Sequence, residues 1–117
     1  MKNQTITVYG IPNCDSVKKA RTWLSDQGLA YEFHDFKKQG VPEAELAHWV
    51  AAAGWETVLN RKGTTWRKLD AATQATVVDS ASAQALMLNQ ASAIKRPVIA
   101  WPSGQITVGY TPENWPA

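Results

Sequence analysis

The chain has 117 residues, of which 44% are hydrophobic and 19% are charged, and twelve cationic side chains against ten acidic ones leave a net charge of +2. This length fits one domain and this composition an ordinary globular protein, which excludes a disordered chain. The balanced charge gives no reason to expect nucleic-acid or membrane binding. The first residues carry no long apolar segment, so neither a signal peptide nor a transmembrane span is expected. Since Cys14 is the one cysteine, no disulfide can form within the chain, and a lone thiol indicates a reducing compartment, the cytoplasm.

The N-terminal third predicts a strand, a helix and a second strand. Residues 5–9 are β-branched and aromatic and end in the turn 10–13, which is typical of a strand. Apolar residues three and four apart predict an amphipathic helix over 15–27, with Gly28 as its stop. Residues 31–36 alternate at their start and predict the second strand. The three elements form a βαβ unit, which predicts parallel strands with a right-handed crossover.

The middle of the chain is predicted to be helical. Three segments each begin with a residue suited to the first turn of a helix: they cover 42–53, 70–78 and 80–89 and begin at Pro42, at Asp70, and at Ser80 or Ser82. A proline fits the first helical position because its missing N–H would have no partner there, whereas Asp and Ser side chains cap exposed N–H groups. A dense polar segment over 59–69 separates the first two helices.

The C-terminal part returns to strands. Residues 97–101 and 105–108, separated by a Pro-Ser-Gly turn, predict an antiparallel hairpin. Pro97 stands at the first position of its strand, where a sheet tolerates proline. Residues 111–114 predict the start of a short helix. Since no repeat, linker or low-complexity tract interrupts the chain, we expect one domain over 1–117.

The order of these elements predicts an α/β fold. A βαβ unit followed by a C-terminal β-hairpin gives a mixed four-stranded sheet, and the helices of the middle segment form an insertion over roughly 42–92. We expect a monomer, because no apolar stripe is left over once the core is assigned. No metal site is expected, because His34 and His48 have neither clustered carboxylates nor a second cysteine beside them.

Cys14 lies between the end of the first predicted strand and the start of the first helix. Ligands of open α/β sheets bind at this edge, and a helix N-terminus carries unpaired N–H groups and a partial positive charge. Because both favour a thiolate, we predict that Cys14 is nucleophilic and has a lowered pKa. Lys18, one turn further on, is expected to help slightly, and Asn13 either orients the thiolate or caps the helix. The alternative interpretation is a buried cysteine that acts as a small hydrophobe.

Three blocks of the sequence resemble the ArsC-related family, and most of all its YffB branch. They read YGIPNCDSVKKAR over residues 9–21, RKGTTWRKL over 61–69 and IKRPV over 94–98. The resemblance implies a thioredoxin-like fold with a helical insertion, in which Cys14 is the nucleophile. It also implies that Arg61 and Arg96 bind an anion, and that Pro97 follows a cis peptide bond. Without the resemblance, the two arginines would be interpreted as surface cations in solvated loops.

Three positions depart from the pattern of the family. Gly10 stands where glutathione-coupled arsenate reductases carry a histidine. These enzymes also have a third arginine in or near the final hairpin, where this chain has Gln105 and no arginine. Because forked guanidinium donors suit tetrahedral oxyanions, the loss of one weakens the case for arsenate. Val17 stands where the Spx regulators carry the second cysteine of a C-x-x-C pair, which excludes a switch through an internal disulfide.

The resemblance implies a glutathione-dependent thiol–disulfide oxidoreductase that acts through Cys14. A second thiol would resolve the mixed disulfide, with glutathione as co-substrate rather than bound cofactor, and the partner is glutathione, another small thiol or disulfide, or glutaredoxin. The residues expected to bind glutathione or the substrate are Arg61, Arg96, Pro97, Asn13 and Lys18. Two alternatives stay open: an arsenate reductase coupled to glutathione or glutaredoxin, and a non-catalytic Spx-like regulator or adaptor that binds transcription machinery.

Overall fold

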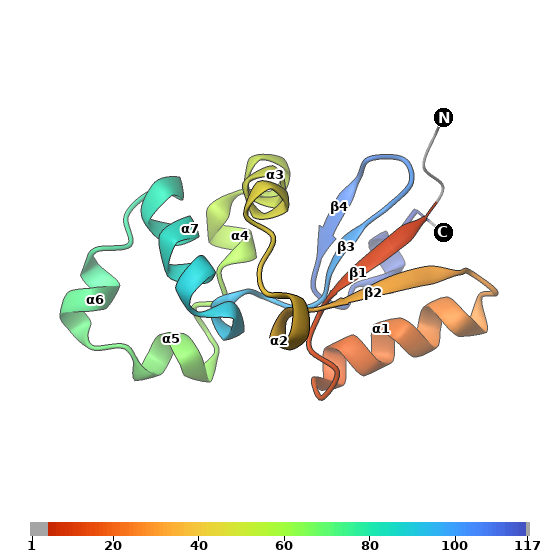
Figure 1. The fold of residues 1–117 in the computed structure, drawn as a ribbon, viewed down its shortest axis with the longest axis horizontal. Coiled ribbons are helices and arrows are strands. Elements are labelled where there is room, and N and C mark those ends of the chain that lie inside the picture. Colours follow the sequence, from red (N-terminus) through yellow and green to blue (C-terminus); the bar gives the residue numbers. More distant parts are fainter. Residues whose placement is uncertain (1–4, 117) are drawn as a thin grey trace. The chain divides into compact units, whose positions relative to one another are not determined.

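The computed structural model describes residues 5–116, which divide into two units. The first unit is built from the described residues up to 40 and from 96 onward, and the second from residues 41–95 (Figure 1). The helical insertion expected over 42–92 falls within the second unit. The expectation about a signal peptide concerns in part residues 1–4, which lie outside the described residues. Among residues 5–116, no helix is long and apolar enough to cross a membrane.

The first unit contains a mixed sheet. Within residues 5–116 the sheet has four strands in the spatial order β2-β1-β3-β4: β1 (Ile6–Gly10), β2 (Tyr31–Asp35), β3 (Val98–Ala100) and β4 (Ile106–Val108). β1 and β2 are parallel, whereas β1 with β3 and β3 with β4 are antiparallel. The predicted βαβ unit, hairpin and mixed four-stranded sheet are therefore confirmed. Each strand end differs from its prediction by at most one residue.

Helix α1 (Asp15–Asp26) covers the sheet with its apolar face (Figure 1). Val17, Ala20 and Leu24 are fully buried, and their spacing of three and four residues is the pattern that predicted the helix. Ala20 and Leu24 join a core cluster with Ile6, Val8, Ile99, Trp101 and Trp115. Gly28 follows the helix with a φ of +73°, a conformation that costs glycine little because it has no Cβ.

Aromatic side chains attach the C-terminal segment to α1. The predicted short helix near 111–114 is present as η2 (Pro112–Asn114), and Trp115 follows it. The Trp115 ring lies edge-on to Trp23 of α1, with ring centres 5.1 Å apart, and 5.5 Å from the ring of Trp101. Such tilted and edge-to-face pairs stabilise a core beyond the area that they bury.

The second unit is helical. Its elements are α3 (Glu43–Ala53), α4 (Trp55–Val58), α5 (Thr64–Lys68), α6 (Ala71–Ala75), α7 (Ser80–Asn89) and η1 (Ala91–Ala93). Its core includes the fully buried side chains of Leu46, Trp49, Val58, Met87 and Ile94. A β-bridge between Leu59 and Ile94 joins the segment after α4 to the segment after η1, supported by hydrogen bonds from Asn60 N–H to the Ala93 carbonyl and from Lys95 N–H to the Val58 carbonyl, both 2.8 Å. The sequence analysis predicted α3 but neither α4 nor α5.

The predicted end of α6 is wrong. Asp70 caps α6 by accepting a hydrogen bond from the Thr73 N–H at 2.7 Å, but the helix ends at Ala75 rather than at residue 78. The three β-branched residues that follow, 76–78, are poor helix formers, which accounts for the early end.

The cap of α7 is Asp79 and neither Ser80 nor Ser82. The Asp79 carboxylate accepts from the Ser82 N–H at 2.9 Å, and the Ser82 hydroxyl accepts from the Asp79 N–H at 3.1 Å. This reciprocal pair is a capping box in which Ser82 holds the third helical position. Similarly, Pro42 is the cap residue of α3 rather than its first helical residue.

We expect Leu24→Ala to lower the free energy of unfolding by about 2–5 kcal/mol, because it opens a cavity between α1 and the sheet. Ser25→Ala, an exposed change at the next position of the same helix, should alter it by about 0.5 kcal/mol or less. Urea unfolding followed by near-UV circular dichroism measures both. Equal stability of the two variants would contradict the packing of α1 on the sheet.

Candidate active site

Cys14 is the cap residue at the N-terminus of α1, directly after the loop that follows β1. Its backbone is extended, with φ −108° and ψ 128°, and its carbonyl accepts the Lys18 N–H at 2.9 Å, a bond of the first helical turn. The residue is partly buried. The sulfur is thus carried at the positive end of a 12-residue helix, where a negative charge is stabilised, as the sequence predicted.

The surroundings of the thiol lower the pKa of Cys14. Burial is the largest single effect and raises it, but the Val17 N–H, the hydrogen bond and charge of the Arg96 guanidinium, and the Ser16 N–H together outweigh burial. The Cys14 side chain makes no capping hydrogen bond to the helix. The Val17 and Ser16 N–H groups nevertheless favour a negative charge on the sulfur and so lower its pKa. Lys18 is not among these groups. The help expected from Lys18 is therefore not found, since its exposed charge is screened by water.

Arg96 and Pro97 lie at the same edge of the sheet as Cys14. The antiparallel pairing of Tyr9 with Val98 places the residues just before β3 beside the end of β1. The Arg96–Pro97 peptide bond is cis, which confirms the expectation, and Pro97 is fully buried. The Arg96 side chain acts on the Cys14 thiol through hydrogen bonding and charge, both of which lower its pKa. The structure thus brings three of the predicted site residues together within the first unit.

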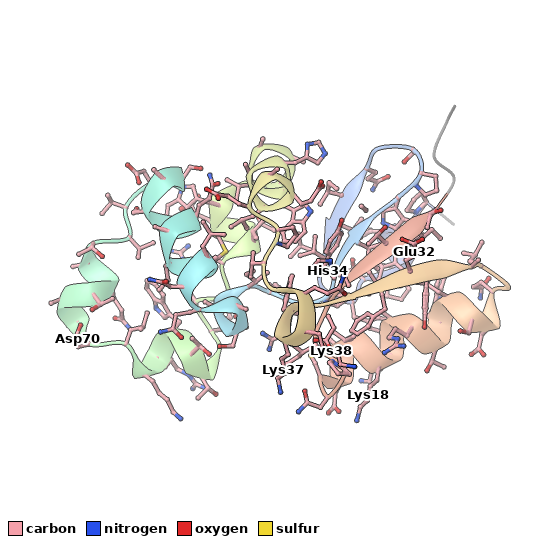
Figure 2. All side chains as sticks on the ribbon, viewed as in Figure 1. Lys18, Glu32, His34, Lys37, Lys38 and Asp70 are labelled. Carbon is pink, nitrogen blue, oxygen red and sulfur yellow. The ribbon has the colours of Figure 1, made fainter. Side chains whose placement is uncertain are left out.

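Two lysines that the sequence analysis did not single out also belong to this edge. Because β1 and β2 are parallel, their C-terminal ends meet there, and α2 (Phe36–Gln39) begins directly after β2. The buried Asp35 caps α2 by accepting the Lys37 N–H at 2.9 Å. Lys37 and Lys38 are exposed, and in the view of Figure 2 they lie toward the same side of the first unit as Lys18. A helix of four residues is too short to show an amphipathic period, so the sequence did not predict α2. The signal that could have pointed to these lysines was their position directly after a predicted strand.

Arg61 lies in the second unit, between α4 and α5. Its guanidinium is 3.9 Å from the Glu56 carboxylate, with both side chains substantially exposed, and 5.5 Å from the centre of the Trp55 ring. An ion pair of this length in water contributes little to stability. Arg61 also lines a hollow of about 260 Å³, in which it, Lys62 and Lys95 outnumber the one carboxylate, Glu56. Its participation with Cys14 stays a prediction.

The remaining candidates have different surroundings. Asn13 is exposed and does not cap α1, because Cys14 holds that position; the orienting role is the alternative left. His34 is half-buried: its ring lies 5.1 Å from that of Tyr9, and its Nε2 hydrogen-bonds to the Gly40 carbonyl at 2.9 Å. His48 is exposed on α3. Among the described residues, no three His, Cys, Asp or Glu side chains are grouped in a way that could hold a metal ion.

A mixed sheet of β2-β1-β3-β4 order, with a cysteine at the start of α1 and a cis proline before β3, defines a thioredoxin-like protein. A family model places the chain more closely. The model of the ArsC family matches residues 9–117, and the chain therefore belongs to the ArsC family.

Individual relatives agree with this assignment. An uncharacterised protein of Haemophilus influenzae is 35% identical over 112 residues, 96% of both chains. The global transcriptional regulator Spx of Streptococcus agalactiae is 28% identical over 80% of this chain and 69% of its own. Among solved structures, a YffB protein is 51% identical with a TM-score of 0.87, covering 93% of this chain and 94% of its own. An arsenate reductase (ArsC) related protein of Brucella melitensis is 48% identical with a TM-score of 0.74, covering 93% and 89%.

We expect Arg96→Gln to raise the pKa of the Cys14 thiol, because the change removes the charge next to the sulfur. Lys18→Gln is the matched control. It removes an exposed cation near the start of α1 that is not among the groups that lower the thiol pKa, so this pKa should stay at its wild-type position. The pH dependence of alkylation by iodoacetamide, followed by intact mass, measures both. Equal shifts in the two variants would mean that the lowered pKa reflects general positive charge rather than the Arg96 contact.

The lowered pKa of Cys14 also predicts how stability depends on pH. Because the folded thiol titrates below the unfolded value of about 8.5, the thiolate stabilises the folded state, fully above that value and not at all once pH falls below the folded pKa. The stability of the wild type relative to Cys14→Ser should therefore rise with pH across this interval. Urea midpoints in reducing buffer at several pH values give the difference, and a pH-independent difference would contradict the lowered pKa.

Proposed function

We propose that this protein is a thiol reductase with Cys14 as its nucleophile and glutathione as its co-substrate. The observation that carries the proposal is the position of the Cys14 sulfur at the N-terminus of α1, within hydrogen-bonding reach of Arg96. Thiolate rather than thiol is the attacking species in thiol–disulfide exchange, and this position favours the thiolate. Membership of the ArsC family supports the same class of chemistry.

The reaction consists of two exchanges of a sulfur–sulfur bond. In the first, the Cys14 thiolate attacks the glutathione sulfur of a glutathione mixed disulfide; the Cys14–glutathione bond forms, the old S–S bond breaks, and the second thiol leaves as a thiolate. In the second, the thiolate of another glutathione attacks that same glutathione sulfur, which releases Cys14 and oxidised glutathione. Since the chain has one cysteine, the resolving thiol comes from outside, either from glutathione or from a glutaredoxin.

The cations at the sheet edge suit a co-substrate with carboxylates. Glutathione carries two of them, and the planar guanidinium of Arg96 can pair with one in a forked geometry beside the reacting sulfur. Lys18, Lys37 and Lys38 are exposed and add positive charge to the first unit. We assign Arg61 of the second unit to the same role, and the backbone beside Pro97 to the peptide portion of glutathione.

Arsenate reduction is a second candidate, favoured by the Brucella melitensis relative, whose name links it to arsenate reductase. The missing third arginine argues against arsenate reduction. The loop of the final hairpin carries the exposed Gln105 where a third arginine would be needed. Arg21 is engaged at β2, where its guanidinium donates to the Tyr31 hydroxyl at 3.0 Å and lies 4.2 Å from the centre of the Phe33 ring.

A non-catalytic regulator is the third candidate, favoured by the identity with Spx. A switch through an internal disulfide is excluded because the chain has one cysteine, and the fully buried Val17 holds the place of the second. Binding to transcription machinery would therefore have to be independent of an internal disulfide. The lowered pKa of Cys14 has no role in such a function, which is why we rank it below the reductase.

We expect the wild type to reduce the mixed disulfide of glutathione and 2-mercaptoethanol with glutathione as reductant, and Cys14→Ser to fall to the uncatalysed rate. Thr22→Ser, an exposed change on the same helix, controls for the preparation and should keep full activity. Formation of oxidised glutathione, coupled to glutathione reductase, gives the rate. Undiminished activity of Cys14→Ser, or no turnover by the wild type, would overturn the proposal. Replacing the disulfide by arsenate tests the second candidate, and stoichiometric binding of RNA polymerase without turnover would favour the third.

A further inference from the structure

Gly10, the last residue of β1, faces Val17 of α1 at a distance that leaves no room for a side chain. A Cβ at position 10 would lie 2.7 Å from Val17 Cγ2 and 3.6 Å from Val17 Cγ1. Carbon atoms in favourable contact are about 3.5–4.0 Å apart, so the first distance is a clash. The φ of Gly10 is not positive, and its backbone conformation is open to any residue. Position 10 is therefore glycine because of the close approach of α1.

The Val17 side chain cannot easily give way. It is fully buried, and a β-branched side chain within a helix keeps essentially one χ1 rotamer. The methyl group that approaches Gly10 is attached directly to Cβ and is not the end of a flexible chain. A methyl group added at position 10 therefore forces the end of β1 and the first turn of α1 apart.

That first turn is the part of the helix that acts on the sulfur. The Val17 N–H, with the Ser16 N–H beside it, faces Cys14 and favours its thiolate. The Lys18 N–H holds the Cys14 carbonyl at 2.9 Å. The Val17 side chain thus packs against Gly10, while the Val17 N–H acts on the Cys14 thiol. The spacing between β1 and α1 is therefore linked to the position of the N–H groups.

We propose that Gly10 is a positioning residue for Cys14 and acts through the buried side chain of Val17. The absence of a side chain at position 10 lets the first turn of α1 lie against the end of β1, with its N–H groups directed at the sulfur. Position 10 itself then supplies no group to the chemistry. The inference rests on the proposed function where it treats Cys14 as the reacting residue, but its test measures the free thiol and needs no substrate.

The test is a double-mutant cycle between positions 10 and 17. Gly10→Ala should raise the thiol pKa of Cys14 toward its ordinary value and slow its alkylation at neutral pH. Val17→Ala alone removes the two methyl groups but keeps the N–H, so it should lower stability and leave the thiol pKa close to that of the wild type. In the double variant the clash is absent, and the thiol pKa should return to that of Val17→Ala.

Leu24→Ala is the control for loss of stability, because it weakens the packing of the same helix nearly three turns away from Cys14. It should unfold more easily and keep the wild-type thiol pKa, as followed by the pH dependence of iodoacetamide alkylation on folded protein. An unchanged thiol pKa in folded Gly10→Ala, or a double variant that stays at the shifted value, would overturn the proposal. If Gly10→Ala does not fold, a folded double variant with the pKa of Val17→Ala supports the proposal, and an unfolded double variant overturns it. Failure of the reductase assay would leave these outcomes unaffected.

Discussion

The opposition between burial and charge at a single sulfur atom is the constraint around which the first unit is arranged. Burial alone would keep Cys14 protonated, and the Val17 and Ser16 N–H groups together with Arg96 reverse that tendency. These groups come from parts of the chain about 80 residues apart, and the pairing of β1 with β3 is what brings them to one edge. A thiolate at this position therefore depends on the sheet as much as on the helix.

The same arrangement explains why recognition and chemistry are joined at this edge. Arg96 lowers the pKa of the sulfur. In the proposed function, its planar guanidinium also pairs with a carboxylate of the co-substrate beside that sulfur. The buried Pro97 holds the adjoining backbone in place, and the Gly109 N–H donates to its carbonyl at 2.8 Å. The backbone next to Arg96 is thus held in place by burial and hydrogen bonding.

Much of this was predictable from sequence, and the failures have physical causes. Strands and α1 follow from short-range periodicity, and the cis bond before Pro97 followed from the resemblance of three sequence blocks. The early end of α6 reflects the β-branched residues 76–78, whose effect a single capping signal does not show. The cap of α7 depended on a choice among adjacent Asp and Ser side chains that all suit a cap, which geometry alone decides. The reason for glycine at position 10 was out of reach, because it is a distance between two elements that have no sequence signature in common.

The division of the chain at residues 40 and 96 has a consequence for how proteins of this family can diverge. Cys14, Arg96 and Pro97, with the strands that hold them, all belong to the first unit, whereas residues 41–95 contribute Arg61 and a cationic hollow. The groups that lower the pKa of Cys14 thus all lie within the first unit. Under the proposed function, substitutions in residues 41–95 would change the ligand preference while these groups are kept.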